Sequence, residues 1–481
     1  KGDLQRLTLT VLLKCFQKLG YLPKVQSVPP AIIEHIAARH KIVLKRPLTT
    51  VPKRTRVRYR QAIHAYLNAK PYGVGGQKTI EPVIREAALT MSDPADLINV
   101  AIEQLVLHHY ELPGFSTLDE FVNHIRHQTH LRLYGQVTAN LTVEETTMLD
   151  ALLQKAPYET RYPVTRLKAL PAKATLTVMQ KWEQHLTWLE GILDPQPHVS
   201  VLTHTKMEQF ATEAYQLEVG DLIDIRSKRR RRTLLLCLLH QMQVRTRDQL
   251  VDMYLKRVRA MHNSGKKKLR ALQDAYRSMS EEVTNTFGQI VEKVAETEIE
   301  EMDAAKQKEQ DAALGRQVRQ ILAAGGGVKY FQSNYQLLSA LHNNNYLPLI
   351  QGYHQRYRGA FFRLTKQLQI QAASQNKQLL TALEYVQQTQ YASPPYLDDE
   401  IAIGFATPRW RSLIRKKVEG EWKLQKEHLQ ACVFSYIADG LRNGDLYVVG
   451  SERFADYRTQ LLDWSTCEDM LTGYCQAVEI P

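Results

Sequence analysis

The sequence lacks the features that would indicate a membrane protein, a secreted protein or a metalloenzyme. Its 481 residues contain no apolar run of about 18 or more, so no transmembrane helix is expected. It has no secretory signal, and its five cysteines show no CxxC spacing, which favours reduced core thiols in a cytoplasm. The motifs HExxH, GxxxxGK[ST] and a GxGxxG after a strand are absent, so no cofactor and no small-molecule substrate is indicated. Because the chain starts inside a helical pattern without an initiator methionine, we expect a fragment of a longer protein.

Runs with the period of a β-strand are also scarce, and the apolar pattern is helical almost everywhere. The chain is too long for a single core, so several domains are expected. Stretches rich in Gly and Pro suggest their boundaries, at residues 71–77, 157–175, 193–200, 325–327 and 391–408. The sequence therefore predicts an all-α protein with several small helical domains, a long helix and a helical scaffold.

Positive charge is concentrated in two parts of the chain. The net charge is +13, and residues 1–75 contain 15 Lys and Arg against two acids. Residues 226–270 again contain 15 Lys and Arg against two acids, so the remaining residues together carry net negative charge. Two separate, strongly basic blocks are typical of a protein that binds a polyanion such as DNA.

A predicted helix at residues 53–68 carries cations of the first block. Tyr59, Ile63 and Tyr66 share one face, which should pack against the domain. Because few acids lie nearby in the sequence, we expect the cations to contact DNA phosphates rather than form internal ion pairs. The candidates are Lys53, Arg54, Arg56, Arg58 and Arg60.

Two predicted helices around a Pro-Gly turn form a helix-turn-helix-like unit between the basic blocks. Asp93 and Pro94 open the first helix, and residues 116–119 (STLD) predict the cap of the second. Side chains of the second helix suit base edges or phosphates, although they could equally be the solvent face of a packed helix. These candidates are Ser116, Asn123, Arg126, His127 and His130.

The second basic block opens with RSKRRRR at residues 226–232. This run leads straight into an apolar segment, so we expect a structured helix start, where cations oppose the helix dipole and favour an external anion. Each phosphate neutralised should add about 0.9 to the salt dependence of binding. The DNA-contact candidates are Arg226, Lys228, Arg229, Arg230, Arg231, Arg232, Arg245, Arg247, Lys266, Lys267 and Lys268.

A long helix or partial coiled coil is predicted over residues 266–322. Leu269, Tyr276, Val283 and Ile290 recur every seven residues, and the charge turns acidic between residues 281 and 303. This helix is one candidate for dimerisation, and the region after Gly327 is the other.

Groups that could be mistaken for catalytic or metal sites have simpler explanations. His124, His127 and His130 are spaced so that each step turns a helix by about 300°, and they cannot converge on one ion. Asp398 and Asp399 are adjacent and point apart, and the acids at 281–303 form a solvated helix face. No catalytic residue and no metal ligand is assigned. Three tryptophans are expected in the core of the last domain, with base stacking by one of them as the alternative; they are Trp410, Trp422 and Trp464.

Three stretches resemble the Tn-three family of replicative transposases. Residues 111–130 (ELPGFSTLDEFVNHIRHQTH) are similar to a family segment in which LPxFSTLD opens a helix. Residues 9–42 and the arginine-rich helix before Lys70 resemble the family's N-terminal domain. Residues 441–470 (LRNGDLYVVGSERFADYRTQLLDWSTCEDM) resemble its GDLWVxGSxRFxD segment. These stretches occur in the family's order along nearly the whole chain.

The resemblance implies a bacterial protein that binds the terminal inverted repeats of a transposon as double-stranded DNA and pairs two ends as a homodimer. It also implies a downstream RNase H-like domain with catalytic acids and Mg²⁺, and no residue of this chain matches those acids. The alternative is a helical DNA-binding regulator or architectural protein without enzymatic activity, and an RNA-binding scaffold is a third interpretation.

Five domains are predicted from these patterns. They are a helical DNA-binding domain (1–73), a helix-turn-helix-like DNA-binding domain (74–158), a third basic helical DNA-binding domain (159–265), the long helix (266–327) and a helical scaffold (328–481).

Overall fold

The computed structural model describes residues 2–43, 48, 51–155, 157, 159–171, 173–296, 304–342, 344–374 and 377–477. Helices account for 72% of the structure and strands for 4%, which confirms the predicted all-α class. The chain divides into two compact units. The first comprises Lys1–Ala169 and Gly191–Met242, and the second comprises Leu170–Glu190 and Gln243–Pro481. Among the described helices, none has the length and apolar character needed to cross a bilayer.

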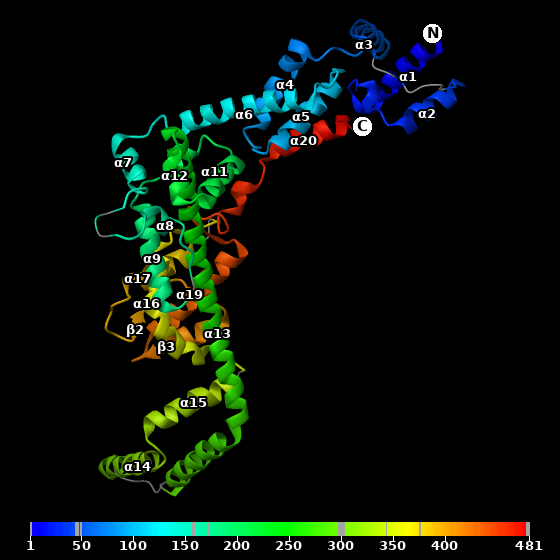
Figure 1. The fold of residues 1–481 in the computed structure, drawn as a ribbon. Coiled ribbons are helices and arrows are strands. Elements are labelled where there is room, and N and C mark those ends of the chain that lie inside the picture. Colours follow the sequence, from blue (N-terminus) through cyan, green and yellow to red (C-terminus); the bar gives the residue numbers. More distant parts are fainter. Residues whose placement is uncertain are drawn as a thin grey trace. The chain divides into compact units, whose positions relative to one another are not determined.

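The first unit is built from helices, which Figure 1 shows in blue, cyan and green. They are α1 (Gly2–Leu19), η1 (Val25–Ser27), α2 (Pro30–Arg39), α3 (Lys53–Leu67), α4 (Gly73–Ala87), α5 (Pro94–Leu107), α6 (Phe115–Val137), α7 (Val143–Ala151), α8 (Pro163–Leu167), α10 (Gln196–Val199), α11 (His204–Gln216), α12 (Val219–Asp224) and the start of α13 (Lys228–Glu296).

Local sequence explains several of these helix starts. Pro30 occupies the first turn of α2, where its missing N–H costs nothing. The Asp93 carboxylate accepts a hydrogen bond from the Ala95 N–H at 2.8 Å, so α5 begins where the sequence predicts. A reciprocal capping box between Thr142 and Glu145 starts α7.

One prediction about a helix start is wrong. α6 begins at Phe115 with Gly114 as its N-cap, so Ser116 lies inside the first turn and does not cap the helix. The domain boundary suggested at residues 71–77 stays a prediction, and α4 begins within this stretch, at Gly73. The glycines there serve close packing, because a Cβ at Gly76 would lie 2.7 Å from the Tyr72 ring.

Two apolar clusters form the core around helices α1 to α6. One collects buried residues of α1, α2 and α3, and the other collects buried residues of α4, α5 and α6. The predicted pair α5 and α6 therefore packs with a third helix, α4. On α3, Ile63 is buried as expected, but Tyr66 is 73% exposed because it lies off the stripe that runs from Tyr59 through Ile63 to Leu67.

A buried lysine holds the loop between α4 and α5 through hydrogen bonds. Lys206 of α11 is fully buried, and its Nζ donates to the Met91 carbonyl at 2.7 Å and to the Ser92 hydroxyl at 2.8 Å. Gln209 and Thr203 bond the same loop, as does Arg126 from α6. Burial, with a smaller effect of the Arg126 charge, lowers the pKa of Lys206 to about 8.

Helix α13 (Lys228–Glu296) starts in the first unit and continues in the second, with a length of 69 residues. The helix predicted from residue 266 therefore starts much earlier. Leu234, Cys237, Leu239 and the residues between them are all fully buried. A helix that is buried on every side carries no amphipathic period, so the heptad pattern did not reveal this part. The boundary predicted after residue 265 lies inside α13, and the five-domain division stays a prediction.

The second unit contains most of α13, together with further helices and short strands (Figure 1). They are α9 (Leu176–Glu190), α14 (Ala304–Ala324), α15 (Val328–His342), η2 (Leu347–Ile350), α16 (Gln351–Gln367), β1 (Ile370–Ala372), α17 (Gln378–Gln388), β2 (Tyr396–Asp398), α18 (Pro408–Ile414), β3 (Arg415–Val418), β4 (Glu421–Gln425), α19 (Lys426–Asn443), β5 (Leu446–Val448), η3 (Tyr457–Gln460) and α20 (Trp464–Ala477).

An aromatic cluster holds α13 against α16 and α19 in the second unit. Tyr254 of α13 is fully buried, and its hydroxyl donates to the Phe434 carbonyl at 2.8 Å. Phe361 lies between them, with ring centroids 5.7 Å from Tyr254 and 5.4 Å from Phe434. α19 also packs against α17 and α18, so it is the central helix of this unit.

Two small antiparallel sheets were not expected from the sequence. β1 pairs with β5, and a second sheet has the order β2-β4-β3. The strands are three to five residues long, too short for an alternating pattern to stand out from a helical background.

The seven-residue series of α13 packs partly within the chain. Leu269 lies in a cluster with Ala340 and Leu349, and Leu272 packs against it. The later members Val283 and Ile290 are only half-buried. Residues 297–303 lie outside the described residues, so part of the predicted acidic stretch and of the long helix is not assessed.

The cysteine prediction is confirmed and the tryptophan prediction is partly wrong. The five cysteines are free thiols, and Cys15, Cys237 and Cys432 are buried. Trp410 is buried, but Trp422 is 60% and Trp464 75% exposed.

We predict that Lys206→Met changes how stability depends on pH. Because burial lowers the folded-state pKa to about 8 from 10.5, the unfolded chain binds more protons between these values. The free energy of unfolding of the wild type, relative to the variant, should therefore rise from pH 8 to pH 10.5, by at most about 1.4 kcal/mol per pH unit. Urea denaturation across this range measures it. Lys78→Met, at an exposed site on α4, should reproduce the wild-type curve. Parallel curves for wild type and Lys206→Met would contradict the prediction.

Candidate nucleic-acid interface

Helix α3 presents a cationic outer surface. Lys53, Arg54, Arg56 and Arg58 are all exposed, and the structure gives them no ion pair with any described residue. The apolar stripe through Ile63 faces the core, which directs Arg54 and Arg58 away from it at about 100° per residue. Arg54 and Arg58 therefore share the outward face of α3, whereas Arg56 lies within about 20° of Ile63 on the core side, exposed near the start of the helix.

The fifth cation, Arg60, has an internal partner. Its Nε lies 2.7 Å from the Glu111 carboxylate, which is buried and is also 2.8 Å from the His64 ring. The expectation that internal partners are scarce is wrong for Arg60, because the acid comes from beyond the first block of the sequence. The contact ties α3 to the segment before α6.

The predicted contacts on α6 differ in exposure and in whether they have internal partners. Ser116 and His127 are exposed. Asn123 donates to Asp119 at 2.8 Å, and Arg126 donates to the Ser92 carbonyl at 2.9 Å, so both are engaged inside the unit.

His130 is a packing residue. Its ring centroid lies 5.5 Å from Phe210, and its Nε2 lies 3.4 Å from the Lys206 Nζ. Burial, and then the charges of Lys206 and Arg126, lower its pKa to about 4. A neutral, enclosed imidazole of this kind is not suited to a phosphate contact.

The basic run at the start of α13 is divided in the same way. Arg232 binds Asp150 through two nitrogens, at 2.8 and 3.4 Å. Arg231 lies 4.0 Å from the same carboxylate, and Arg230 pairs with Glu213 at 2.6 Å. Internal acids therefore offset part of the charge that opposes the helix dipole, which the sequence assigned to an external anion. Arg226, Lys228 and Arg229 are exposed and have no ion-pair partner among the described residues.

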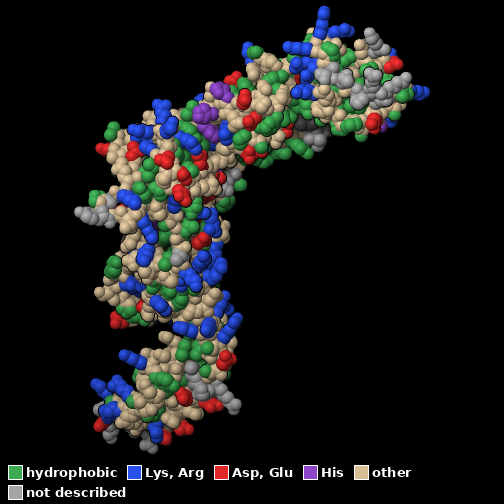
Figure 2. Space-filling view, in the orientation of Figure 1, with side chains coloured by type: hydrophobic (Ala, Val, Ile, Leu, Met, Phe, Trp, Pro, Cys, Tyr) green, Lys and Arg blue, Asp and Glu red, His purple; other side chains and the backbone are tan. Residues whose placement is uncertain are grey.

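A longer line of cations follows α13 within the second unit. At about 100° per residue, its members fall in one arc of the helix. All are exposed, and none forms an ion pair with a described residue; they are Arg245, Lys256, Arg259, Lys266, Lys267 and Arg270. We name these six residues the α13 cation stripe. Figure 2 shows Lys and Arg side chains gathered along this part of α13.

Other candidates of the second block do not belong to the stripe. Arg247 is half-buried and binds Glu190 at 2.8 Å, while Lys268 is exposed but lies off the arc. Conversely, Lys256, Arg259 and Arg270 were not among the predicted contacts. Counting positions at 100° per residue from Arg245 would have found them in the sequence.

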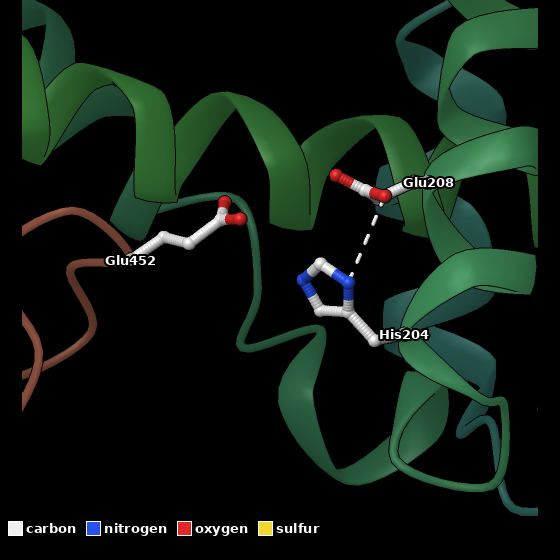
Figure 3. A group of neighbouring side chains, drawn as sticks. All are labelled: His204, Glu208 and Glu452. Carbon is white, nitrogen blue, oxygen red and sulfur yellow. Dashed lines mark ion pairs between the residues drawn. The ribbon is translucent and has the colours of Figure 1, made fainter. Parts of the chain in front are cut away.

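The acidic surface of α11 differs from these basic surfaces. His204 and Glu208 form an ion pair one helical turn apart, with 3.7 Å between nitrogen and oxygen (Figure 3). A hollow of about 670 Å³ beside them is lined by acids that include Glu213 and Asp221. Negative lining of this kind is unsuited to phosphate. Glu452, also drawn in Figure 3, belongs to the second unit.

Comparison with known proteins shows which proteins the chain is similar to. A family model described as a domain of unknown function (DUF4158) matches residues 1–125. Beyond that segment, the chain is similar along nearly its whole length to transposases of Tn-three type, which confirms the resemblance seen in the sequence.

Among these relatives is the transposase for transposon Tn501 of Pseudomonas aeruginosa, 22% identical over 96% of this chain and 45% of the relative. The transposase for transposon Tn21 of Escherichia coli is 20% identical over 100% of this chain and 47% of the relative. The transposase for transposon Tn1546 of Enterococcus faecium is 20% identical over 92% and 44%. The chain thus spans about half the length of the relatives it matches.

We predict that Arg229 and Arg232 differ in role although they belong to one run. Arg232→Ala should lower the free energy of unfolding by about 1.5–3 kcal/mol, because it removes a charged hydrogen-bonded pair with Asp150. Arg229→Ala should change stability by less than about 0.5 kcal/mol and weaken duplex binding. Urea denaturation and fluorescence anisotropy with a labelled duplex separate the effects. A stable Arg232→Ala protein with weakened binding would contradict this division.

Proposed function

We propose that this chain binds duplex DNA through exposed cations that have no internal acid partner, and that it is the end-binding part of a transposase. The α13 cation stripe carries this proposal. From Arg245 to Arg270 it extends about 37 Å at 1.5 Å per residue, close to the roughly 34 Å of one DNA turn. Six unpaired cations on one rigid helix would repel each other in the free protein, and the phosphates of a duplex relieve that repulsion.

The first unit contributes two further groups of exposed cations. One lies on α3, and the other consists of Arg226, Lys228 and Arg229 at the start of α13. Two basic units on one chain raise the effective concentration of each for the same DNA molecule, which increases affinity without additional contacts. Exposed His127 on α6 is the residue of the helix-turn-helix-like unit best placed to contact base edges.

The finer part of the proposal concerns the ends of a transposon. Relatives named as transposases match the chain from end to end. We propose that the duplex is a terminal inverted repeat in a bacterial cytoplasm, and that two copies of the chain pair two ends. The full-length protein would cleave and join DNA through an RNase H-like domain with Mg²⁺, to which no residue here is assigned.

The far part of α13 is the candidate for pairing two copies. Phe287, Val291 and Val294 are exposed, whereas Leu269 and Leu272 already pack within the chain. The seam that could meet a second copy therefore lies after residue 283 rather than along the whole seven-residue series.

We predict that replacing Arg245, Lys256, Arg259 and Lys267 by Ala weakens binding to specific and random duplexes alike. The slope of log affinity against log salt should fall by about 0.9 for each phosphate that the variant no longer neutralises. Anisotropy titrations between low and physiological salt measure it. The matched control replaces exposed cations of α14, Lys308, Arg316 and Arg319, and should keep the wild-type slope. An unchanged slope in the stripe variant would contradict phosphate binding by the stripe.

End recognition is tested by footprinting. The chain should protect a terminal repeat of a Tn-three type transposon at concentrations that leave a scrambled duplex of equal length unprotected. His127→Ala should reduce this difference, while Thr147→Ala, at an exposed site on α7 that is not among the contact candidates, serves as control. Equal protection of both duplexes would favour the architectural DNA-binding protein over the end-binding transposase.

A further inference from the structure

A basic β-hairpin in the second unit belongs to none of the cationic groups on α3 and α13 described above. β3 and β4 pair antiparallel and are joined by the two-residue turn Glu419-Gly420 (Figure 1). Both turn residues have positive φ, 52° and 90°, as in the tight turns that match strand twist. Positive φ is unfavourable for glutamate, so the hairpin holds its shape despite a local cost.

Cations dominate this hairpin and its surroundings. Residues 409–426 contain seven Lys and Arg against two acids, within the part of the chain whose overall charge is negative. Lys423 stands between Lys416 of β3 and Asp398 of β2 in the strand register, so a carboxylate of the sheet offsets part of the repulsion between the two lysines. Because successive residues of a strand point to opposite faces, these three side chains lie on the other face of the sheet from Lys417.

Trp422 lies among these cations with its indole exposed. It is 60% exposed and stands directly opposite Lys417, whose side chain lies on the same face of the sheet. On the same strand, Leu424 is fully buried and anchors the hairpin, whereas Trp422 is accessible to a partner. A large exposed aromatic ring with cations beside it offers both a stacking surface and a phosphate site.

We propose that this hairpin binds an unpaired DNA strand, with a base stacked on Trp422 and a phosphate at Lys417, which lies on the same face of the sheet. In a duplex the faces of the bases cover one another, so a flat indole gains stacking only where bases are unpaired. The negative charge of the DNA strand also complements the positive charge of the hairpin. This site is separate from the duplex-binding surfaces proposed above, and either can fail without the other.

The test compares a labelled oligothymidine with a duplex of the same length, titrated with the full chain. Trp422→Ala should weaken oligothymidine binding about 5- to 150-fold, which corresponds to about 1–3 kcal/mol of stacking. Trp422→Phe should retain most of the affinity, because its ring still stacks. Lys417→Ala should weaken binding and flatten its salt dependence, whereas Lys416→Ala, on the other face of the sheet, should change neither. Duplex binding should stay within about twofold in all these variants.

Trp464→Ala is the matched control, since Trp464 is 75% exposed on α20, and it should bind oligothymidine like the wild type. Unchanged oligothymidine binding in Trp422→Ala would overturn the proposal. An equal loss for duplex and single strand, or tighter binding of oligouridine than of oligothymidine, would overturn it as well. The α13 stripe variant should keep its Trp422-dependent single-strand binding, which distinguishes failure of this proposal from failure of the duplex proposal.

Discussion

Helix α13 has to be apolar on one side and cationic on the other, and both the fold and the proposed DNA surface depend on that. Leu234–Leu239, near its start, are buried on every side in the first unit, and its inner side supplies the fully buried Tyr254 to the second unit. Its outer side displays the cation stripe in the second unit. Because a helix fixes both faces through one backbone, the packing that buries Tyr254 also sets the direction of Arg259 and Lys256. The rigidity of the stripe is therefore a consequence of core packing rather than of the cations.

Internal acids separate structural cations from those available to a partner. Arg230 and Arg232 belong to the same run as Arg229, yet Glu213 and Asp150 neutralise the first two. A cation paired with a partly buried acid has already lost much of its water and gains little from a phosphate. An exposed cation without such an acid keeps its full charge for long-range attraction. Charge density in the sequence indicates where to expect polyanion binding. The acids that approach in the folded chain then decide which cations are available to the polyanion.

The sequence predicts the helical class, the free thiols and the general position of both basic blocks, because these depend on composition and short periodicities. It fails where a feature depends on distant residues. Glu111 is far from Arg60 along the chain, so no local pattern pairs them. The helix start after the basic run is predicted and confirmed, but its continuity with the helix predicted from residue 266 is not visible in the sequence. His130 was predicted to be a polar contact residue, but it packs against Phe210 and Lys206 of α11.

The β3–β4 hairpin is a surface feature that the sequence did not predict. Summing charge over long blocks left it inside a negative remainder, and tryptophan is ordinarily a core residue, so neither signal pointed to a surface. Only strand pairing places Lys417 opposite Trp422 and Lys416 opposite Lys423. An exposed indole is costly in water, and Lys417 beside it on the same face has no ion pair with a described residue. One partner that stacks and carries negative charge would contact both. A nucleic-acid strand has both properties in each nucleotide, which is why the hairpin favours it over an acidic protein surface.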